Sequence, residues 1–155
     1  GLWTILVIGG LTRCLGIADR SLWFDEASSW WMATRFGGTE LLDRCAANVH
    51  PPLYYLLLAG WTAIWGDSPF ALRLLSVLAG VGTVIGGYLL TAEVAAGPAG
   101  VNTVRPAPPA RDSQTLGWAA AALLATNTAQ LTWSQEARMY APGACATVVS
   151  GWLLL

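Results

Sequence analysis

The chain has 155 residues, of which 55% are hydrophobic and only 11% are charged. A soluble domain normally carries about 25% charged residues, so this composition is typical of a membrane protein. The formal net charge of −1 offers no basic face to a polyanion, which argues against nucleic acid as a partner. The cysteines form no CxxC pair and no metal-ligand spacing, so we expect neither a disulfide framework nor a metal centre built on them.

Apolar segments recur along the whole chain, and we expect them to form helices, because only helices and closed barrels satisfy their backbone in lipid. No alternating pattern of the barrel kind is present. The predicted fold is therefore all-α, a polytopic transmembrane helical bundle. The five segments are 2–18, 52–65, 70–96, 116–131 and 141–155.

Three polar stretches separate these segments. The loop 19–50 contains two amphipathic stretches, 25–36 and 40–49, which predict short helices lying on the membrane surface. Residues 97–115 are rich in proline, alanine and glycine, which predicts a disordered linker. The weak positive charge of this linker favours the cytoplasmic side of the membrane. If the 19–50 loop is external and the next two apolar segments both cross the membrane fully, the linker is external too, so the two predictions conflict. Two alternatives resolve this conflict: the second apolar segment is re-entrant, or the charge of the linker does not indicate its side of the membrane.

Asp25 and Glu26 stand side by side directly after the first apolar segment. A carboxylate at a membrane edge can act as a general base toward a hydroxyl, and a divalent cation held there is an open alternative. The plainer interpretation is a pair of first-turn acids that complement a helix dipole, worth under about 1 kcal/mol.

His50, the one histidine, precedes two prolines at the start of the second apolar segment. Pro51 restricts the backbone of His50 to an extended form, which holds the imidazole at the interface. There it can donate to a phosphate, although a merely solvated histidine at a helix start is the alternative. We expect Asp25, Glu26 and His50 to converge in one outward-facing cavity fed by lipid.

The segment 133–140 (WSQEARMY) packs an amide, an acid, a cation and a phenol between two apolar segments. Arg138 can bind a phosphate in a bidentate manner. The alternative is a surface pair of Glu136 with Arg138, worth little, with Tyr140 in the aromatic belt.

Two further arginines are candidates for binding an anion. Arg73 opens the third apolar segment, where we expect it to snorkel to the interface, with a phosphate contact as the alternative. Arg20 lies five residues before Asp25, close enough to belong to the same site.

The order and spacing of four motifs resemble the N-terminal part of integral-membrane glycosyltransferases of the GT-C class. The closest groups are the family 39 (protein O-mannosyltransferase-like) enzymes and the bacterial RgtA/B/C/D-like glycosyltransferases, with the aminoarabinose transferases of lipid A more distant. The motifs are 22–27 (LWFDEA), 50–55 (HPPLYY), 71–76 (ALRLLS) and 133–140 (WSQEARMY).

The resemblance implies transfer of a sugar, mannose or another hexose or pentose, from a polyprenyl-phosphate donor to an acceptor on the outer face, usually with inversion. It implies that Asp25 deprotonates or orients the acceptor hydroxyl and that Glu26 supports it. His50 falls where these enzymes contact the lipid phosphate or substrate, and Glu136 and Arg138 would line the same pocket. It also implies a multi-pass protein of the plasma membrane, with a bacterial cell envelope as its setting.

A lipid-phosphate leaving group needs cations or hydrogen-bond donors at the interface, and the candidates are Arg20, His50, Arg73, Arg138 and Tyr140. We expect residues 1–155 to be one part of a longer transmembrane domain, inactive alone. Two other classes stay open, a non-catalytic or degenerate membrane subunit and a transporter fragment. No nucleotide-binding glycine motif and no nucleophile elbow is present.

Overall fold

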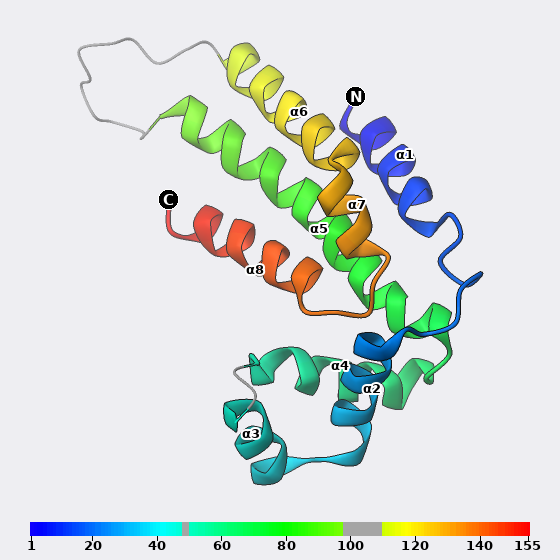
Figure 1. The fold of residues 1–155 in the computed structure, drawn as a ribbon. Helices are drawn as coiled ribbons and strands as arrows, with labels where there is room; N and C mark the ends of the chain where they lie inside the picture. The colour runs from blue at the N-terminus through cyan, green and yellow to red at the C-terminus, as the bar shows by residue number, and fades with distance from the viewer. Residues whose placement is uncertain (48–49, 98–109) are drawn as a thin grey trace.

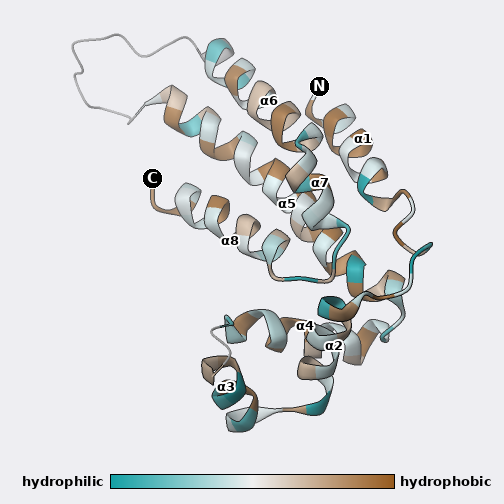
Figure 2. Cartoon of the chain, in the orientation of Figure 1, coloured by the Kyte–Doolittle hydropathy of each residue, from teal (hydrophilic) through white to brown (hydrophobic). Residues whose placement is uncertain are grey.

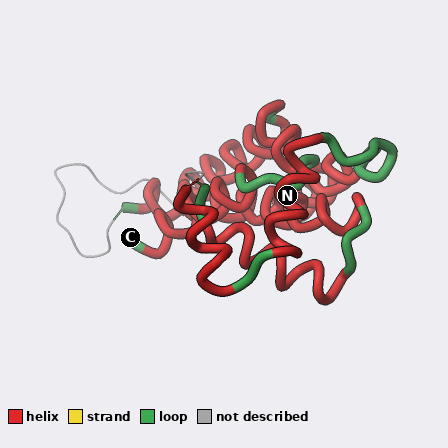
Figure 3. The backbone as a smooth tube through the Cα atoms, turned by 60° about the horizontal axis from the view of Figure 1, so that its bottom comes forward, coloured by secondary structure: helices red, strands yellow, loops and turns green. Residues whose placement is uncertain are grey.

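The structure, a computed structural model, describes residues 1–47, 50–97 and 110–155, with the side chains of residues 110 and 111 left aside. All secondary structure in this part of the chain is helical, with no strand, as Figure 3 shows. The all-α prediction is therefore confirmed.

A bundle of helices is built around one long central helix, α5 (Pro69–Ala96). In Figure 1, α6 and α8 run along α5 on opposite sides, while α1 lies against α5 and α6. The short helix α7 continues from α6 after a break. The surrounding helices are α1 (Leu2–Cys14), α6 (Ala110–Thr126), α7 (Thr128–Ser134) and α8 (Tyr140–Leu153).

The sequence of α5 explains both its start and its close neighbours. The Ser68 hydroxyl accepts a hydrogen bond from the Ala71 amide at 3.2 Å, and proline takes the first helical position, where its missing N–H costs nothing. Further along, Gly87 faces a side-chain methyl group of Leu124 so closely that a Cβ would not fit. Small residues on α5 therefore let α6 pack directly onto its backbone.

A second layer lies below one end of this bundle (Figure 1). It contains α2 (Phe24–Arg35), α3 (Gly38–Ala47) and α4 (Pro52–Trp65). Leu58 of α4 and Leu72 of α5 are both fully buried in the core that joins the two layers. The two short helices predicted in the loop after α1 are thus present, while their position on a membrane surface stays a prediction; residues 48–49 lie outside the described part.

Three predicted boundaries are wrong. The first apolar helix ends at Cys14 rather than at residue 18, because Gly16 adopts a positive φ of 69° and turns the chain. The segment 116–131 is not one helix, because Asn127 breaks it and its side chain caps α7 by accepting from the Gln130 amide at 3.0 Å. The linker is shorter than predicted, because α6 already begins at Ala110; residues 98–109 lie outside the described part.

Membrane crossing is supported for one helix. Among the described residues, only α5 is both long and apolar enough to span a bilayer, and α1 is a shorter apolar helix. The multi-span bundle stays a prediction.

Candidate functional site

Hydrophilic residues occur where the two layers meet, as the teal segments of the ribbon in Figure 2 show. The four motifs of the sequence come together there, although they are far apart along the chain. Leu22, Tyr54, Leu72 and Ala137, one residue from each motif, share a single hydrophobic core cluster. The junction is therefore the candidate functional site.

Glu26 and Arg73 form a buried ion pair at the centre of this junction. Arg73 Nη2 lies 2.6 Å from Glu26 Oε2, and Arg73 Nε lies 2.8 Å from Glu26 Oε1. The backbone amides of Ala137 and Trp23 also donate to Glu26, at 2.8 and 3.3 Å. Glu26 is 0% exposed, so its carboxylate is enclosed by four donors.

The hydrogen-bond donors of the Arg73 guanidinium are likewise all occupied. Besides Glu26, it donates to the carbonyl oxygens of Ile17, Arg20 and Ser21 at 2.8, 2.9 and 3.1 Å. A guanidinium has five N–H groups, and these contacts use them all. Arg73 therefore ties the loop after α1 to α5 and has no donor left for a phosphate.

These contacts determine the ionisation of Glu26. Burial alone would raise the pKa of the Glu26 carboxyl, but the hydrogen bonds from Arg73 and Ala137 outweigh burial and hold the pKa below its usual range. A carboxylate with a low pKa and no open oxygen is a poor proton acceptor. Glu26 is thus suited to hold the junction together, and the expectation that Arg73 snorkels outward is wrong, because this pairing buries it to 5% exposure.

Asp25, the neighbouring acid, has a different environment. Its Oδ2 lies 2.7 Å from Arg138 Nη1, and its side chain keeps 39% of its exposure. No contact engages Oδ1 among the residues that the structure describes. Asp25 is therefore oriented by a cation while one of its oxygens stays open.

Arg138 connects Asp25 to Tyr140. Its Nη2 donates to the Tyr140 hydroxyl at 3.4 Å, and its guanidinium lies 5.4 Å from the centre of the Tyr140 ring. Burial lowers the pKa of Arg138, but the Tyr140 hydroxyl and the Asp25 charge more than compensate, so the pKa is raised overall. Arg138 is a permanent cation next to an exposed carboxylate and an exposed phenol.

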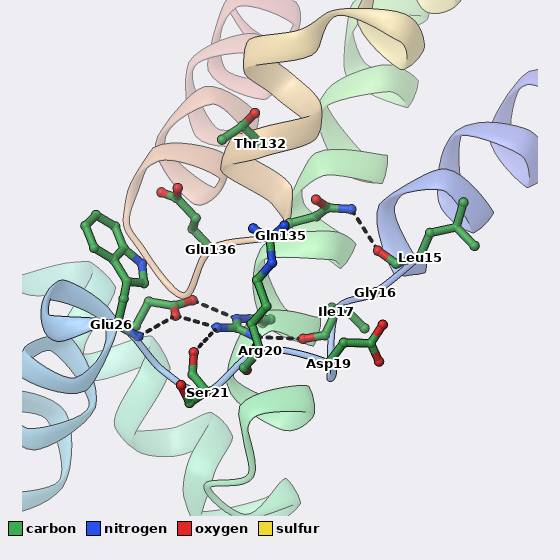
Figure 4. A pocket seen from close by; sticks show the side chains of 12 residues that line it. Leu15, Gly16, Ile17, Asp19, Arg20, Ser21, Glu26, Thr132, Gln135 and Glu136 are labelled. Atoms are coloured by element: carbon green, nitrogen blue, oxygen red, sulfur yellow. Dashed lines mark hydrogen bonds and ion pairs between the residues drawn. The ribbon is translucent and has the colours of Figure 1, made fainter.

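A cavity of about 460 Å³ opens beside the ion pair, between the loop after α1 and the end of α7 (Figure 4). Its lining includes Arg20, Glu26, Arg73, Gln135 and Glu136. Asp19 also lines the cavity, and because Glu26 and Arg73 neutralise each other, the charged groups that a ligand would meet are Asp19, Arg20 and Glu136. The cavity is large enough for a small polar group such as one sugar ring.

Glu136 titrates abnormally in this cavity. Burial raises the pKa of the Glu136 carboxyl, and the negative charge of Glu26 raises it further. Among the charges that oppose this rise is Arg138. Glu136 consequently keeps its proton to a higher pH than Glu26 does.

His50 lies in the second layer, next to the aromatic side chains of α4. Its ring centre is 6.2 Å from that of Tyr55, which in turn interacts with Ser29 of α2. His50 is not among the residues that line the cavity. Its ring is therefore placed beside the α2–α4 packing and not in the cavity beside the ion pair.

The cavity beside the ion pair does not bring together the three residues that the sequence predicts to converge. Neighbouring residues of a helix point about 100° apart, so Glu26 faces the cavity while Asp25 faces Arg138 outside it. Neither Asp25 nor His50 contributes to the cavity wall. The candidate site therefore has two compartments, the cavity with Arg20 and Glu136, and the open Asp25–Arg138 pair.

Two residues for which the sequence predicts no role support the site. Arg13, in the last turn of α1, is fully buried, and Gln135 donates from Nε2 to the Leu15 carbonyl at 3.1 Å. A lone arginine inside an apolar segment was the available signal for Arg13. Nothing in the local sequence predicts the partner of Gln135, because it lies 120 residues away.

An apolar groove of about 300 Å³ lies between α1 and the α6–α7 break. Ile5, Ile8 and Leu131 are among its lining residues. Leu131 lines the groove and the next residue, Thr132, lines the cavity, so α7 borders both hollows.

Metal binding has no support from this geometry. Within residues 1–47, 50–97 and 110–155, no group of three or more His, Cys, Asp or Glu side chains is arranged to hold a metal ion.

Comparison with protein-family models, with curated proteins and with solved structures found no match to this chain. Its class therefore follows from its own geometry: an all-α protein with an apolar bundle, a buried acid–arginine pair and an exposed acid beside it.

Proposed function

We propose that this chain belongs to an integral-membrane glycosyltransferase that transfers a sugar from a polyprenyl-phosphate donor to an acceptor hydroxyl at the outer membrane face. The observation that carries the proposal is the pairing of Asp25 with Arg138, 113 positions apart in the sequence, at 2.7 Å. Both residues belong to motifs on which the resemblance to GT-C enzymes rests. A multi-pass plasma-membrane protein is part of the same proposal.

Asp25 is the proposed general base. One of its oxygens is held by Arg138 and the other is open, so an acceptor hydroxyl can approach without displacing the ion pair. An inverting transfer needs one carboxylate to take the proton of the attacking hydroxyl, and base assistance of this kind contributes about 10²–10⁴-fold. Glu26 acts indirectly, by holding the start of α2.

The remaining candidates divide between donor and acceptor. Arg138 and Arg20 are cations that can neutralise the leaving phosphate, with Tyr140 as an additional hydrogen-bond donor. Glu136 lines the cavity and is suited to contact the sugar. Arg73 is no longer a candidate for binding the phosphate, because Glu26 and three carbonyl groups occupy its donors. His50 would contact substrate only at the edge of the second layer.

The apolar groove supports a lipid-linked donor. It is lined by α1, α6 and α7, and α7 also borders the cavity where Arg20 and Glu136 lie. A polyprenyl chain in the groove would place its phosphate at the polar junction. A soluble nucleotide sugar would have no use for an apolar groove at this position.

The test is a transfer assay on the full-length protein in lipid, with a radiolabelled polyprenyl-phosphate sugar. Replacement of the proposed base, Asp25→Asn, should lower turnover about 10²–10⁴-fold while membrane insertion and donor binding persist. Asp43→Asn is the matched control, because Asp43 is an exposed acid on α3 away from the junction. Normal turnover by Asp25→Asn would refute the assignment, and absence of transfer by the unaltered protein would favour a non-catalytic subunit.

A further inference from the structure

Three helices end at one buried side chain, Arg13. It lies in the last turn of α1, which ends at Cys14. The ends of α6, at Thr126, and of α7, at Ser134, reach the same place. Arg13 is 0% exposed, so its charge is compensated inside the protein or not at all.

The Arg13 side chain contacts its own helix and the ends of α6 and α7. Its Nη1 donates to the carbonyl oxygens of Gly9 and Ala125 at 2.8 and 3.2 Å, and its Nη2 donates to that of Leu124 at 3.1 Å. Its Nε donates to the Ser134 hydroxyl at 3.2 Å. Four hydrogen bonds thus join α1, α6 and α7 through one guanidinium.

The charge of Arg13 is balanced by helix ends. No carboxylate forms an ion pair with it in the part of the chain that the structure describes. The last carbonyl groups of a helix have no partner within the helix and carry about half a negative charge. Leu124 and Ala125 belong to the last turn of α6, so their carbonyl groups turn this partial charge toward Arg13, which explains how an arginine is stable in an apolar bundle.

The segment after Ser134 carries the candidate site. Gln135 donates to the Leu15 carbonyl, Ala137 donates its amide to Glu26, and Arg138 pairs with Asp25. Ser134 is therefore the point at which the bundle holds this segment. The contact needs close packing, since a Cβ on Gly80 of α5 would clash with the Ser134 hydroxyl.

We propose that Arg13 is a positioning residue, which fixes the end of α7 so that Glu136 and Arg138 stand correctly against the α2 acids. The proposal rests on the proposed function for its catalytic consequence, while its structural consequence can be measured without activity. Arg13 does not line the cavity, and its side chain acts through Ser134.

The experiment measures hydrogen exchange and transfer in the full-length protein in lipid. The variants are Arg13→Met, which removes the guanidinium, and Ser134→Ala, which removes one of its acceptors and keeps the apolar packing. Arg35→Met is the control, because Arg35 is an exposed arginine at the end of α2. The structural readout is exchange at the Ala137 amide, and the catalytic readout is kcat and KM for the polyprenyl-phosphate sugar.

We expect exchange at Ala137 to rise about tenfold in Arg13→Met and about fivefold in Ser134→Ala, with no change in the control. Turnover should fall about tenfold or more with KM nearly constant, because misplacement of catalytic groups affects kcat first. If Arg13→Met does not fold, Ser134→Ala provides the test.

Unchanged exchange in Ser134→Ala and in any folded Arg13→Met protein would overturn the inference. Increased exchange with normal kcat, in a protein that Asp25→Asn inactivates, would also overturn it and leave the proposed function intact. Increased exchange in a protein that Asp25→Asn does not affect would support the structural link and refute the proposed function instead.

Discussion

At the scale of single residues, the two adjacent acids of α2 have separate tasks. Glu26 is buried with four donors around it, whereas Asp25 meets one cation and keeps an open oxygen. The sequence predicts that both acids matter, because charge is expensive near a membrane. It does not predict which one is enclosed, because that depends on Arg73 and Ala137, 47 and 111 positions away.

Glu26→Gln should strongly destabilise the protein. The change leaves the buried Arg73 charge without its counterion, and breaking a buried pair from one side typically costs about 3–5 kcal/mol. Thermal unfolding of the full-length protein in detergent measures the loss. The double variant Glu26→Leu with Arg73→Met should recover much of that stability, and a double variant as unstable as Glu26→Gln would contradict the account.

Glu136 should make the free energy of unfolding depend on pH above about 4.3, which is the usual pKa of a glutamate in an unfolded chain. Its pKa in the folded protein is raised, so the stability it contributes is full below that pH and is lost as the pH rises through the folded pKa. Glu136→Gln should therefore raise the melting temperature at pH 7. The gain should vanish near pH 4, and a gain independent of pH would show that burial of charge is not the cause.

At the scale of elements, the apolar helices can be predicted from the sequence, whereas the breaks within them are harder to predict. Residues 52–65 match α4 fully, because prolines mark its start and a glycine follows its end. The segment 116–131 is broken because Asn127 caps α7 instead of staying within α6. The break has a tertiary reason as well, since Arg13 of another helix binds the carbonyl groups of Leu124 and Ala125.

Gly80 and Gly60 provide a matched pair for testing the helix packing. A Cβ at Gly80 would clash with Ser134 and come within 3.0 Å of Arg13 Nε, so Gly80→Ala should cost about 1–3 kcal/mol. A Cβ at Gly60 of α4 meets nothing within 4 Å, so Gly60→Ala should be neutral or stabilise the helix by up to about 1 kcal/mol. Thermal unfolding compares the two, and equal effects would contradict the packing of α7 on α5.

At the scale of the whole molecule, the site depends on tertiary structure. The motifs predict which residues take part, and the shared core cluster of Leu22, Tyr54, Leu72 and Ala137 confirms that the motifs meet. The sequence does not predict the division into two compartments, because this division follows from the direction in which the Asp25 side chain points away from α2. Long-range pairs such as this one have no local sequence signature.

The most direct measurement is a double-mutant cycle on transfer by the full-length protein, with Asp25→Asn, Arg138→Gln and both together. If the two residues act as one unit, each single change should lower kcat about 10²-fold or more. The double variant should then have nearly the same kcat as the less active of the two single variants. If the losses instead multiply in the double variant, Asp25 and Arg138 act independently, and the paired site described above is contradicted.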